Sequence, residues 1–120
     1  MDTDVLIVGA GPTGLMLANQ LARRGVHSVI IDRHAGPSLQ TRALGVHART
    51  LEIYSQLGIV DRALALGKRG NGVQLWAQGR KAAHVPLGNT GSELTPYPYV
   101  LVLGQDDNER IMSERLRDFD

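Results

Sequence analysis

The chain has 120 residues, of which 42% are hydrophobic and 21% are charged, enough apolar material for one globular domain. Its 13 Lys and Arg residues against 12 Asp and Glu residues give a net charge of +1, which argues against nucleic acid or an anionic membrane as a partner. The absence of cysteine excludes disulfides, thiolate-ligated metals and a cysteine nucleophile. No apolar run approaches the ~20 residues that span a bilayer, and the acidic start is unlike a signal peptide, so we expect a cytoplasmic protein.

Residues 4–33 predict a β-α-β unit. Val5 to Val8 form a short apolar run that stops at glycine, as a strand buried on both faces would. Small and apolar residues then recur at helical spacing from Thr13 to Arg24, and Gly25 follows where a C-terminal cap belongs. A second strand is expected over residues 28–32. Two parallel strands joined by a crossover helix predict an α/β fold with a mostly parallel sheet.

The middle of the chain predicts three further segments. Residues 34–45 show no sustained periodicity, which indicates a loop. Helical spacing predicts a helical pair over residues 46–67, with Gly58 between its two members. Residues 72–87 alternate between apolar and polar types around Gly79-Arg80-Lys81, which predicts a small antiparallel β insertion with its turn at that tripeptide.

The last segment, residues 99–119, predicts a strand and a helix. Tyr99 to Leu103 is an apolar run, and apolar positions recur at helical spacing from Asp106 to Phe119. Asp106 or Asp107 is the expected N-cap of that helix. In an α/β layout such a helix leads to another strand, so we expect the N-terminal piece of a larger domain.

A nucleotide-binding pattern lies between the first predicted strand and helix. It is the Gly-x-Gly-x-x-Gly fingerprint, written here as Gly9-Ala10-Gly11-Pro12-Thr13-Gly14. Gly9 allows a tight turn, Gly11 lets the backbone approach a pyrophosphate, and Gly14 lets helix and strand pack closely. The helix N-terminus directs free N–H groups and a partial positive charge at the phosphates. In the alternative interpretation these glycines only make a tight βα turn.

The second strand ends in a carboxylate. Asp32 follows Gly11 by 21 residues, where a dinucleotide-binding unit places an acid that accepts hydrogen bonds from a ribose. The alternative is that Asp32 caps a loop. The fingerprint does not by itself separate FAD from NAD(P), and Arg33 after the acid would suit a 2′-phosphate.

Three segments resemble the N-terminal FAD-binding segment of the class A flavoprotein aromatic hydroxylases. The first is residues 4–15 with Asp32-Arg33, and the third runs from Leu103-Gly104-Gln105 through Leu116. The second reads Thr41-Arg42-Ala43-Leu44-Gly45-Val46-His47-Ala48-Arg49-Thr50-Leu51-Glu52. Members of that family bind FAD, take a hydride from NADPH or NADH, and insert one oxygen atom into a phenol-like ring.

The resemblance implies a role for each matching position. The fingerprint residues Gly9 to Gly14 would hold the FAD pyrophosphate, and Asp32 the adenosine ribose. Arg33 would lie over the adenine side, and Arg42 near the pyrophosphate or the ribityl chain, unless Arg42 is only an exposed loop residue. Gln105 would hydrogen-bond the ribityl side of the flavin.

The fold class we expect is therefore α/β, with a Rossmann-like β-α-β unit and a small antiparallel insertion in an incomplete FAD-binding domain. The function implied is the FAD-binding portion of an NAD(P)H-dependent monooxygenase acting on a small aromatic molecule. The alternatives are another FAD or NAD(P) oxidoreductase of the same superfamily, or a truncated, non-catalytic nucleotide-binding module. About three parallel strands would leave an apolar edge unpaired, which a homo-oligomer or the remainder of the same enzyme would cover.

No catalytic residue and no metal site is assigned. The family's later motifs and its substrate domain are absent from these 120 residues. The four histidines lack the close spacing of a metal-ligand pair, and no Gly-x-Ser-x-Gly nucleophile motif occurs.

Overall fold

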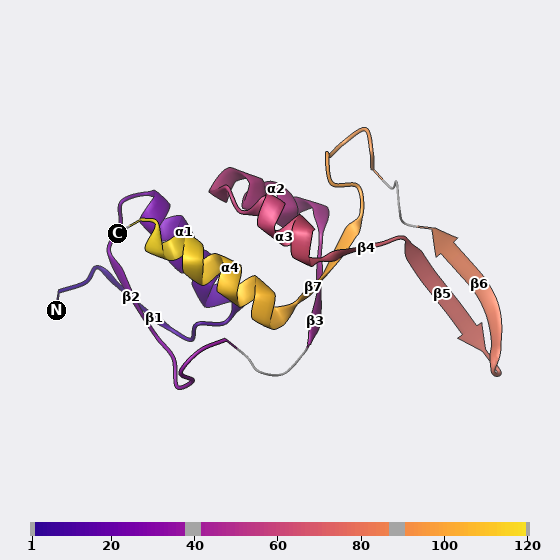
Figure 1. The fold of residues 1–120 in the computed structure, drawn as a ribbon, viewed down its shortest axis with the longest axis horizontal. Coiled ribbons are helices and arrows are strands. Elements are labelled where there is room, and N and C mark those ends of the chain that lie inside the picture. The colour runs from indigo at the N-terminus through magenta and orange to yellow at the C-terminus, as the bar shows by residue number, and fades with distance from the viewer. Residues whose placement is uncertain (1, 38–41, 87–90, 120) are drawn as a thin grey trace.

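A computed structural model describes residues 2–37, 42–86 and 91–119 (Figure 1). The elements follow in chain order: β1 (Val5–Val8), α1 (Pro12–Arg23), β2 (Ser28–Ile31), β3 (Ala43–Val46), α2 (Ala48–Leu57), α3 (Val60–Leu66), β4 (Lys68–Gly70), β5 (Gly72–Ala77), β6 (Arg80–Pro86), β7 (Val100–Gly104) and α4 (Gln105–Arg117). The α/β fold class expected from the sequence is confirmed.

The β-α-β unit comprises β1, α1 and β2. The two strands pair in parallel, with Val5 opposite Ser28 and Val8 opposite Ile31. Gly25, just after α1, has a φ of +73°, a left-handed conformation that glycine adopts without steric cost. The apolar run of β1 does not lie buried on both faces, because Leu6 and Val8 are 58% and 78% exposed.

A second sheet has the order β3-β7-β4, and both of its pairings are antiparallel. The expected mostly parallel sheet is therefore wrong beyond β1 and β2. In β7 the side chains of Leu101 and Leu103 are buried and that of Val102 is exposed, the alternation of a strand with one covered face. Because this run is apolar throughout, its sequence does not show which side chains are buried and which are exposed.

Two strands and two boundaries differ from the sequence prediction. The expected loop over residues 34–45 ends earlier, because β3 begins at Ala43 and includes Val46, which had been expected in a helix. The short, polar β4 was not predicted at all. Helix α4 begins at Gln105 with Gly104 as its N-cap, and no side chain caps it, so the expected Asp106 or Asp107 cap is wrong.

The core lies where α2, α3 and α4 pack against β7. Its most deeply buried apolar side chains are Leu51, Leu57, Ile59, Leu101, Leu103 and Met112. The hydroxyl of the buried Tyr54 in α2 donates a hydrogen bond of 2.6 Å to the Oδ1 atom of Asn108 in α4. Arg115 Nε donates a bond of 2.7 Å to the carbonyl of Leu57, at the end of α2. Polar contacts thus tie α2 to α4 within an apolar core.

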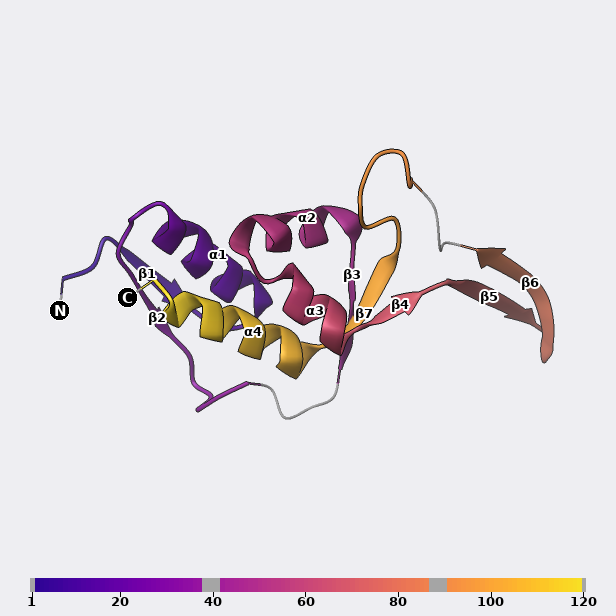
Figure 2. The same ribbon diagram turned by 45° about the horizontal axis from the view of Figure 1, so that its top comes forward.

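Helices α1 and α4 run side by side in the same direction, as Figures 1 and 2 both show. Asn19 lies fully buried between them. Its Nδ2 atom donates to the carbonyl of Leu15 in α1 at 2.9 Å and to the carbonyl of Met112 in α4 at 3.0 Å. Its Oδ1 atom is buried without a partner among the described residues.

The β5–β6 hairpin projects from this body (Figure 1). All of its described residues are exposed, and the molecule extends 59 Å along its longest axis. The radius of gyration of 17.0 Å exceeds the ~13.6 Å of a compact chain of this length because of that projection. The turn lies at Gln78 and Gly79, which both have positive φ, so the turn expected at Gly79-Arg80-Lys81 is misplaced and Arg80 begins β6. Leu87, expected in the insertion, lies outside the described residues.

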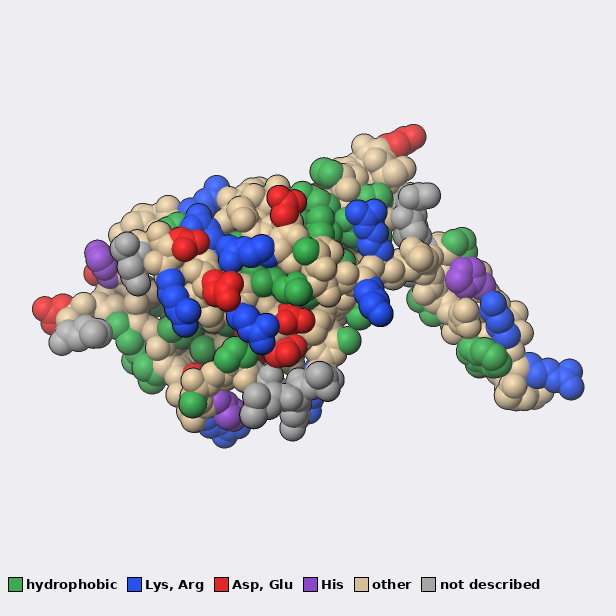
Figure 3. All heavy atoms as spheres, viewed as in Figure 1, with side chains coloured by type: hydrophobic (Ala, Val, Ile, Leu, Met, Phe, Trp, Pro, Cys, Tyr) green, Lys and Arg blue, Asp and Glu red, His purple; other side chains and the backbone are tan. Residues whose placement is uncertain are grey.

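Charged side chains of both signs alternate over α4 and the neighbouring helices (Figure 3). Arg110 pairs with Asp107, Arg62 with Glu114 and Arg115 with Asp118. This face is a solvated surface of paired charges rather than a patch of one sign. Within the described ranges, no helix combines the length and the apolar character needed to cross a membrane.

Candidate functional site

The fingerprint turn, residues 9–14, joins β1 to α1. Gly9 continues the parallel pairing of the strands, since its N–H donates to the carbonyl of Ile31 at 2.7 Å. The φ of Gly9 is +106°, a conformation that side chains strongly disfavour. The first glycine is therefore required by the backbone turn itself.

The other two glycines of the fingerprint turn have contrasting surroundings. A Cβ atom on Gly14 would lie 1.9 Å from the carbonyl oxygen of Gly9, so helix and strand pack too closely for any side chain there. A Cβ atom on Gly11 would meet nothing within 4 Å, and the φ of Gly11 is −78°, which any residue adopts. Nothing in the described chain requires Gly11 to be glycine.

The N-terminus of α1 opens at the same turn. Gly11 is its N-cap, no side chain caps it, and its first turn holds no acidic residue. Pro12 occupies the first turn, where its missing N–H removes no helical bond. The N–H groups of the first turn are the positive end of the helix dipole, and here no side chain neutralises them. The site thus has the polarity that an anionic group requires.

Asp32 follows β2 and bonds to the fingerprint turn. Its Oδ2 atom accepts the N–H of Ala10 at 2.8 Å, and its Oδ1 atom accepts the N–H of His34 at 2.7 Å. The His34 ring lies 3.0 Å from the same Oδ1 atom. These hydrogen bonds, that of His34 first and that of Ala10 second, lower the pKa of Asp32 below its ordinary value of 3.8. The carboxylate is therefore ionised at neutral pH beside the turn.

The structure brings Arg42 and Gln105 together although they lie far apart in the sequence. The backbone N–H of Gln105 donates to the carbonyl of Arg42 at 2.7 Å, continuing the pairing of Ala43 with Gly104. The Gln105 Nε2 atom donates to the Oε1 atom of Glu109 at 3.0 Å. We call these three residues the Gln105 corner. The side chain of Arg42 is exposed, and so is that of Arg33 after β2.

Two hollows adjoin these elements. One, of about 470 Å³, runs along the exposed edge of β1 and reaches Gly9, Gly11 and Thr13. The other, of about 680 Å³, lies beside β2 near the C-terminal ends of α1 and α4 and is lined mainly by apolar residues. Of these two hollows, the first is the one lined by the fingerprint glycines Gly9, Gly11 and Gly14, so it is the one that concerns the candidate site.

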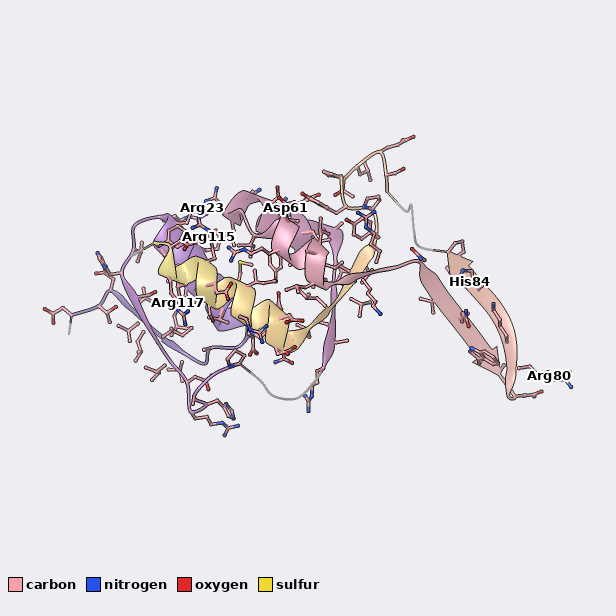
Figure 4. All side chains as sticks on the ribbon, viewed as in Figure 1. Arg23, Asp61, Arg80, His84, Arg115 and Arg117 are labelled. Carbon is pink, nitrogen blue, oxygen red and sulfur yellow. The ribbon has the colours of Figure 1, made fainter. Side chains whose placement is uncertain are left out.

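Five further basic residues in the described part of the chain lie away from the fingerprint turn. Within the described ranges, no group of three or more His, Asp or Glu side chains is placed to hold a metal ion. Arg23, Arg115 and Arg117 lie toward the C-terminal ends of α1 and α4, and Arg80 and His84 lie on the projecting hairpin (Figure 4). These basic residues are therefore at the far ends of the helices from the fingerprint turn or outside the body.

Sequence reasoning missed two residues that contact predicted site residues. Both His34, beside Asp32, and Glu109, beside Gln105, make the hydrogen bonds described above. The i, i+4 spacing of Gln105 and Glu109 on a predicted helix was a usable signal, because such pairs face each other. No comparable spacing signal marks His34, whose contact depends on the turn after β2.

Comparison with known proteins identifies the family. The model of a family described as an FAD binding domain matches residues 2–119. The chain is 44% identical over 112 residues to 6-methylpretetramide 4-monooxygenase of Streptomyces rimosus, a match that covers 93% of this chain and 20% of that protein.

Two solved structures resemble the fold closely. The p-nitrophenol 4-monooxygenase of Pseudomonas putida DLL-E4 superposes with a TM-score of 0.85 at 27% identity, over 96% of this chain and 29% of that one. An aklavinone-11 hydroxylase solved with FAD and aklavinone gives a TM-score of 0.81 at 31% identity, over 98% of this chain and 24% of that one. The chain spans about a fifth of the length of the curated relatives it matches. It belongs to the FAD binding domain family.

Proposed function

We propose that this chain is the FAD-binding portion of an NAD(P)H-dependent monooxygenase that hydroxylates a small aromatic molecule. The observation that carries the proposal is the contrast among the three fingerprint glycines. Gly9 and Gly14 have steric reasons within the chain, whereas Gly11 has none. A glycine without an internal reason, at an uncapped helix N-terminus, suits the close approach of a ligand backbone such as a pyrophosphate.

In this proposal each candidate residue has a binding role. Residues 9–14 hold the pyrophosphate through backbone N–H groups, and Asp32 accepts hydrogen bonds from the adenosine ribose. Arg33 lies toward the adenine, and Arg42 toward the pyrophosphate or the ribityl chain. Gln105 contacts the ribityl side. The hydrogen bond from Ala10 to Asp32 supports this assignment, since it fixes the carboxylate at the end of β2 next to the turn.

The chemistry of such an enzyme belongs to the cofactor. When bound, FAD accepts a hydride from NADPH or NADH and uses oxygen to hydroxylate the aromatic ring. The residues of this chain would bind and orient the cofactor, and we assign none of them a catalytic role. The aromatic substrate class is supported by the similar proteins, whose names refer to p-nitrophenol, aklavinone and 6-methylpretetramide.

The proposal extends to location and partners. We infer a cytoplasmic enzyme without nucleic-acid or membrane partners, consistent with a net charge of +1 and no cysteine. The exposed side chains of Leu6 and Val8, which share one face of β1, favour cover by the remainder of the same enzyme or by a second copy.

The test is a pair of glycine substitutions in the protein expressed at its full natural length. Gly11→Ala should leave the free energy of unfolding within about 0.5 kcal/mol of wild type, because the new methyl group meets nothing. It should weaken FAD binding by about tenfold or more, because the methyl group occupies the ligand side of the turn. Gly36→Ala is the matched control, since a Cβ atom there also meets nothing within 4 Å.

The measurements are thermal melting and titration of the apoprotein with FAD, followed by NADPH or NADH oxidation with phenolic substrates. Equal FAD affinity in both variants would contradict the assigned pyrophosphate site. FAD binding without any substrate-dependent oxidation would favour the non-catalytic nucleotide-binding module. Retention of NAD(P) in place of FAD would favour another oxidoreductase of the superfamily.

A further inference from the structure

The side chain of Gln105 is held from within its own helix. Its Nε2 atom donates to the Oε1 atom of Glu109, one turn further along α4, at 3.0 Å. Its backbone N–H is held by the carbonyl of Arg42 at 2.7 Å. Both the start of the helix and the direction of the amide are therefore set by neighbouring groups of the Gln105 corner.

The identity of the partner decides which end of the amide is held. An ionised carboxylate only accepts hydrogen bonds, so the NH₂ group of Gln105 must face Glu109 and the carbonyl oxygen must point elsewhere. Without a partner of fixed polarity, a glutamine amide could present either end. Glu109 thus selects one of two orientations.

Glu109 holds the Gln105 amide with a carboxyl group that is itself buried, which makes its placement informative. It is only 6% exposed, and burying a carboxylate is unfavourable unless hydrogen bonds compensate. The acidic neighbour Asp107 contacts Arg110 instead, at 3.1 Å. Among the described residues, Glu109 is therefore the acidic residue that bonds directly to the Gln105 amide.

The other end of the amide is available to a ligand. No described donor reaches the Gln105 carbonyl oxygen, and the residue is only half-buried. A carbonyl oxygen accepts hydrogen bonds from hydroxyl groups and is repelled by phosphate oxygens. Of the parts of FAD, the ribityl chain is the one that offers aliphatic hydroxyl donors beside the flavin.

We propose that Glu109 is a positioning residue: it orients the Gln105 amide so that the Gln105 carbonyl oxygen accepts a hydrogen bond from a ribityl hydroxyl group of FAD. This inference rests on the proposed FAD site and adds the polarity of one contact and the residue that sets it. Glu109 itself does not touch the cofactor. Its effect on FAD affinity should therefore pass entirely through Gln105.

The experiment is a double-mutant cycle in the protein at its full natural length, with FAD and ADP as the two probes. ADP carries the adenosine and pyrophosphate of FAD but no ribityl chain. Glu109→Ala should weaken FAD binding by about fivefold to tenfold and leave ADP binding unchanged. In a protein that already carries Gln105→Ala, the same Glu109→Ala change should have no further effect on FAD affinity.

Glu109→Gln is the second variant, in case the alanine variant does not fold. It keeps the length and one acceptor oxygen, but its amide can also turn its NH₂ group toward Gln105, so we expect a loss of about twofold that again vanishes with Gln105→Ala. Thermal melting of each variant measures the structural contribution separately.

The outcomes separate this inference from the function on which it rests. Equal losses of FAD affinity with and without Gln105, or parallel losses for FAD and ADP, would overturn the role of Glu109 while the FAD site stands. A wild-type protein that binds neither probe would overturn both.

Discussion

The fingerprint turn and the Gln105 corner are both proposed to bind FAD, but they are built in different ways. The turn is local: within residues 9–14, one glycine is set by a φ of +106° and another by a close packing contact. The corner is assembled from the segment before β3 and the first turns of α4, through one backbone bond and one side-chain bond. The turn can be recognised from six consecutive residues, whereas the corner forms only when β3 pairs with β7.

The difference also concerns what each region needs in order to survive substitution. The turn depends on the absence of side chains, so it fails by backbone strain at Gly9 or by collision at Gly14. The corner depends on the presence of partners, so it fails by loss of hydrogen bonds. The two regions should therefore respond to different kinds of substitution, and the following changes separate them.

The largest effect should come from Gly14→Ala. The new Cβ atom would lie 1.9 Å from the carbonyl oxygen of Gly9, which is backbone and must move. We expect a loss of about 3 kcal/mol in the free energy of unfolding, at the upper end of overpacking effects. Denaturant unfolding measures this loss. Gly11→Ala is the control, because a Cβ atom at that position meets nothing within 4 Å. A Gly14→Ala protein as stable as wild type would show that helix and strand can separate freely at the turn.

A smaller effect is expected for Tyr54→Phe, which removes a buried hydrogen bond next to the Gln105 corner. The Tyr54 hydroxyl donates to Asn108, next to Glu109 in α4, at 2.6 Å. Removing it leaves a buried acceptor without its donor, at a cost of about 1 to 2 kcal/mol in the free energy of unfolding. Burial raises the pKa of Tyr54 above its ordinary value of 10.0, so its stabilising contribution is lost as the pH rises through the folded-state value.

The matching measurement is unfolding at neutral and alkaline pH. Wild type should lose stability above pH 10 more steeply than Tyr54→Phe, because the variant has no hydroxyl to ionise in the unfolded chain. Identical alkaline profiles would mean that the Tyr54 hydroxyl is not buried in solution.

The smallest effect concerns Asp32, whose carboxylate accepts a hydrogen bond from Ala10 in the fingerprint turn. Its folded-state pKa lies below the ordinary value of 3.8, so the carboxylate stabilises the fold above that pH and the contribution disappears as the pH falls through the lowered value. Asp32→Asn should flatten the acid limb of melting temperature against pH. Asp2→Asn, at an exposed position, serves as the control. An unchanged acid limb would show that the bond to Ala10 contributes nothing to the turn.

The sequence predicted the local parts of this fold better than the assembled ones. The β-α-β unit carries its signals within each element: an apolar run, a helical spacing and a capping glycine. By contrast, β3 contains Gly45 and β4 is Lys68-Arg69-Gly70, so neither looks like a strand until β7 pairs with it. Their formation is a tertiary effect that propensity does not encode.

The same division applies to the candidate site. Residues 9–14 and Asp32 could be selected from spacing alone, whereas Arg42 and Gln105 could be joined only through family resemblance. The misplaced cap of α4 has a related cause: the helix begins at Gln105, whose N–H is held by Arg42, so the aspartates fall inside its first turn instead of before it. Contacts between distant segments moved the boundary that local rules had set.

The buried amide of Asn19 links the two regions compared above. Because it bonds at once to a carbonyl in α1 and to one in α4, neither helix can slide along the other by a turn without breaking a buried hydrogen bond. The axial offset between the two helices is thereby fixed, and with it the separation of the fingerprint turn from Gln105. One asparagine thus acts as a molecular spacer, holding the two contacts proposed for FAD at a constant distance from each other.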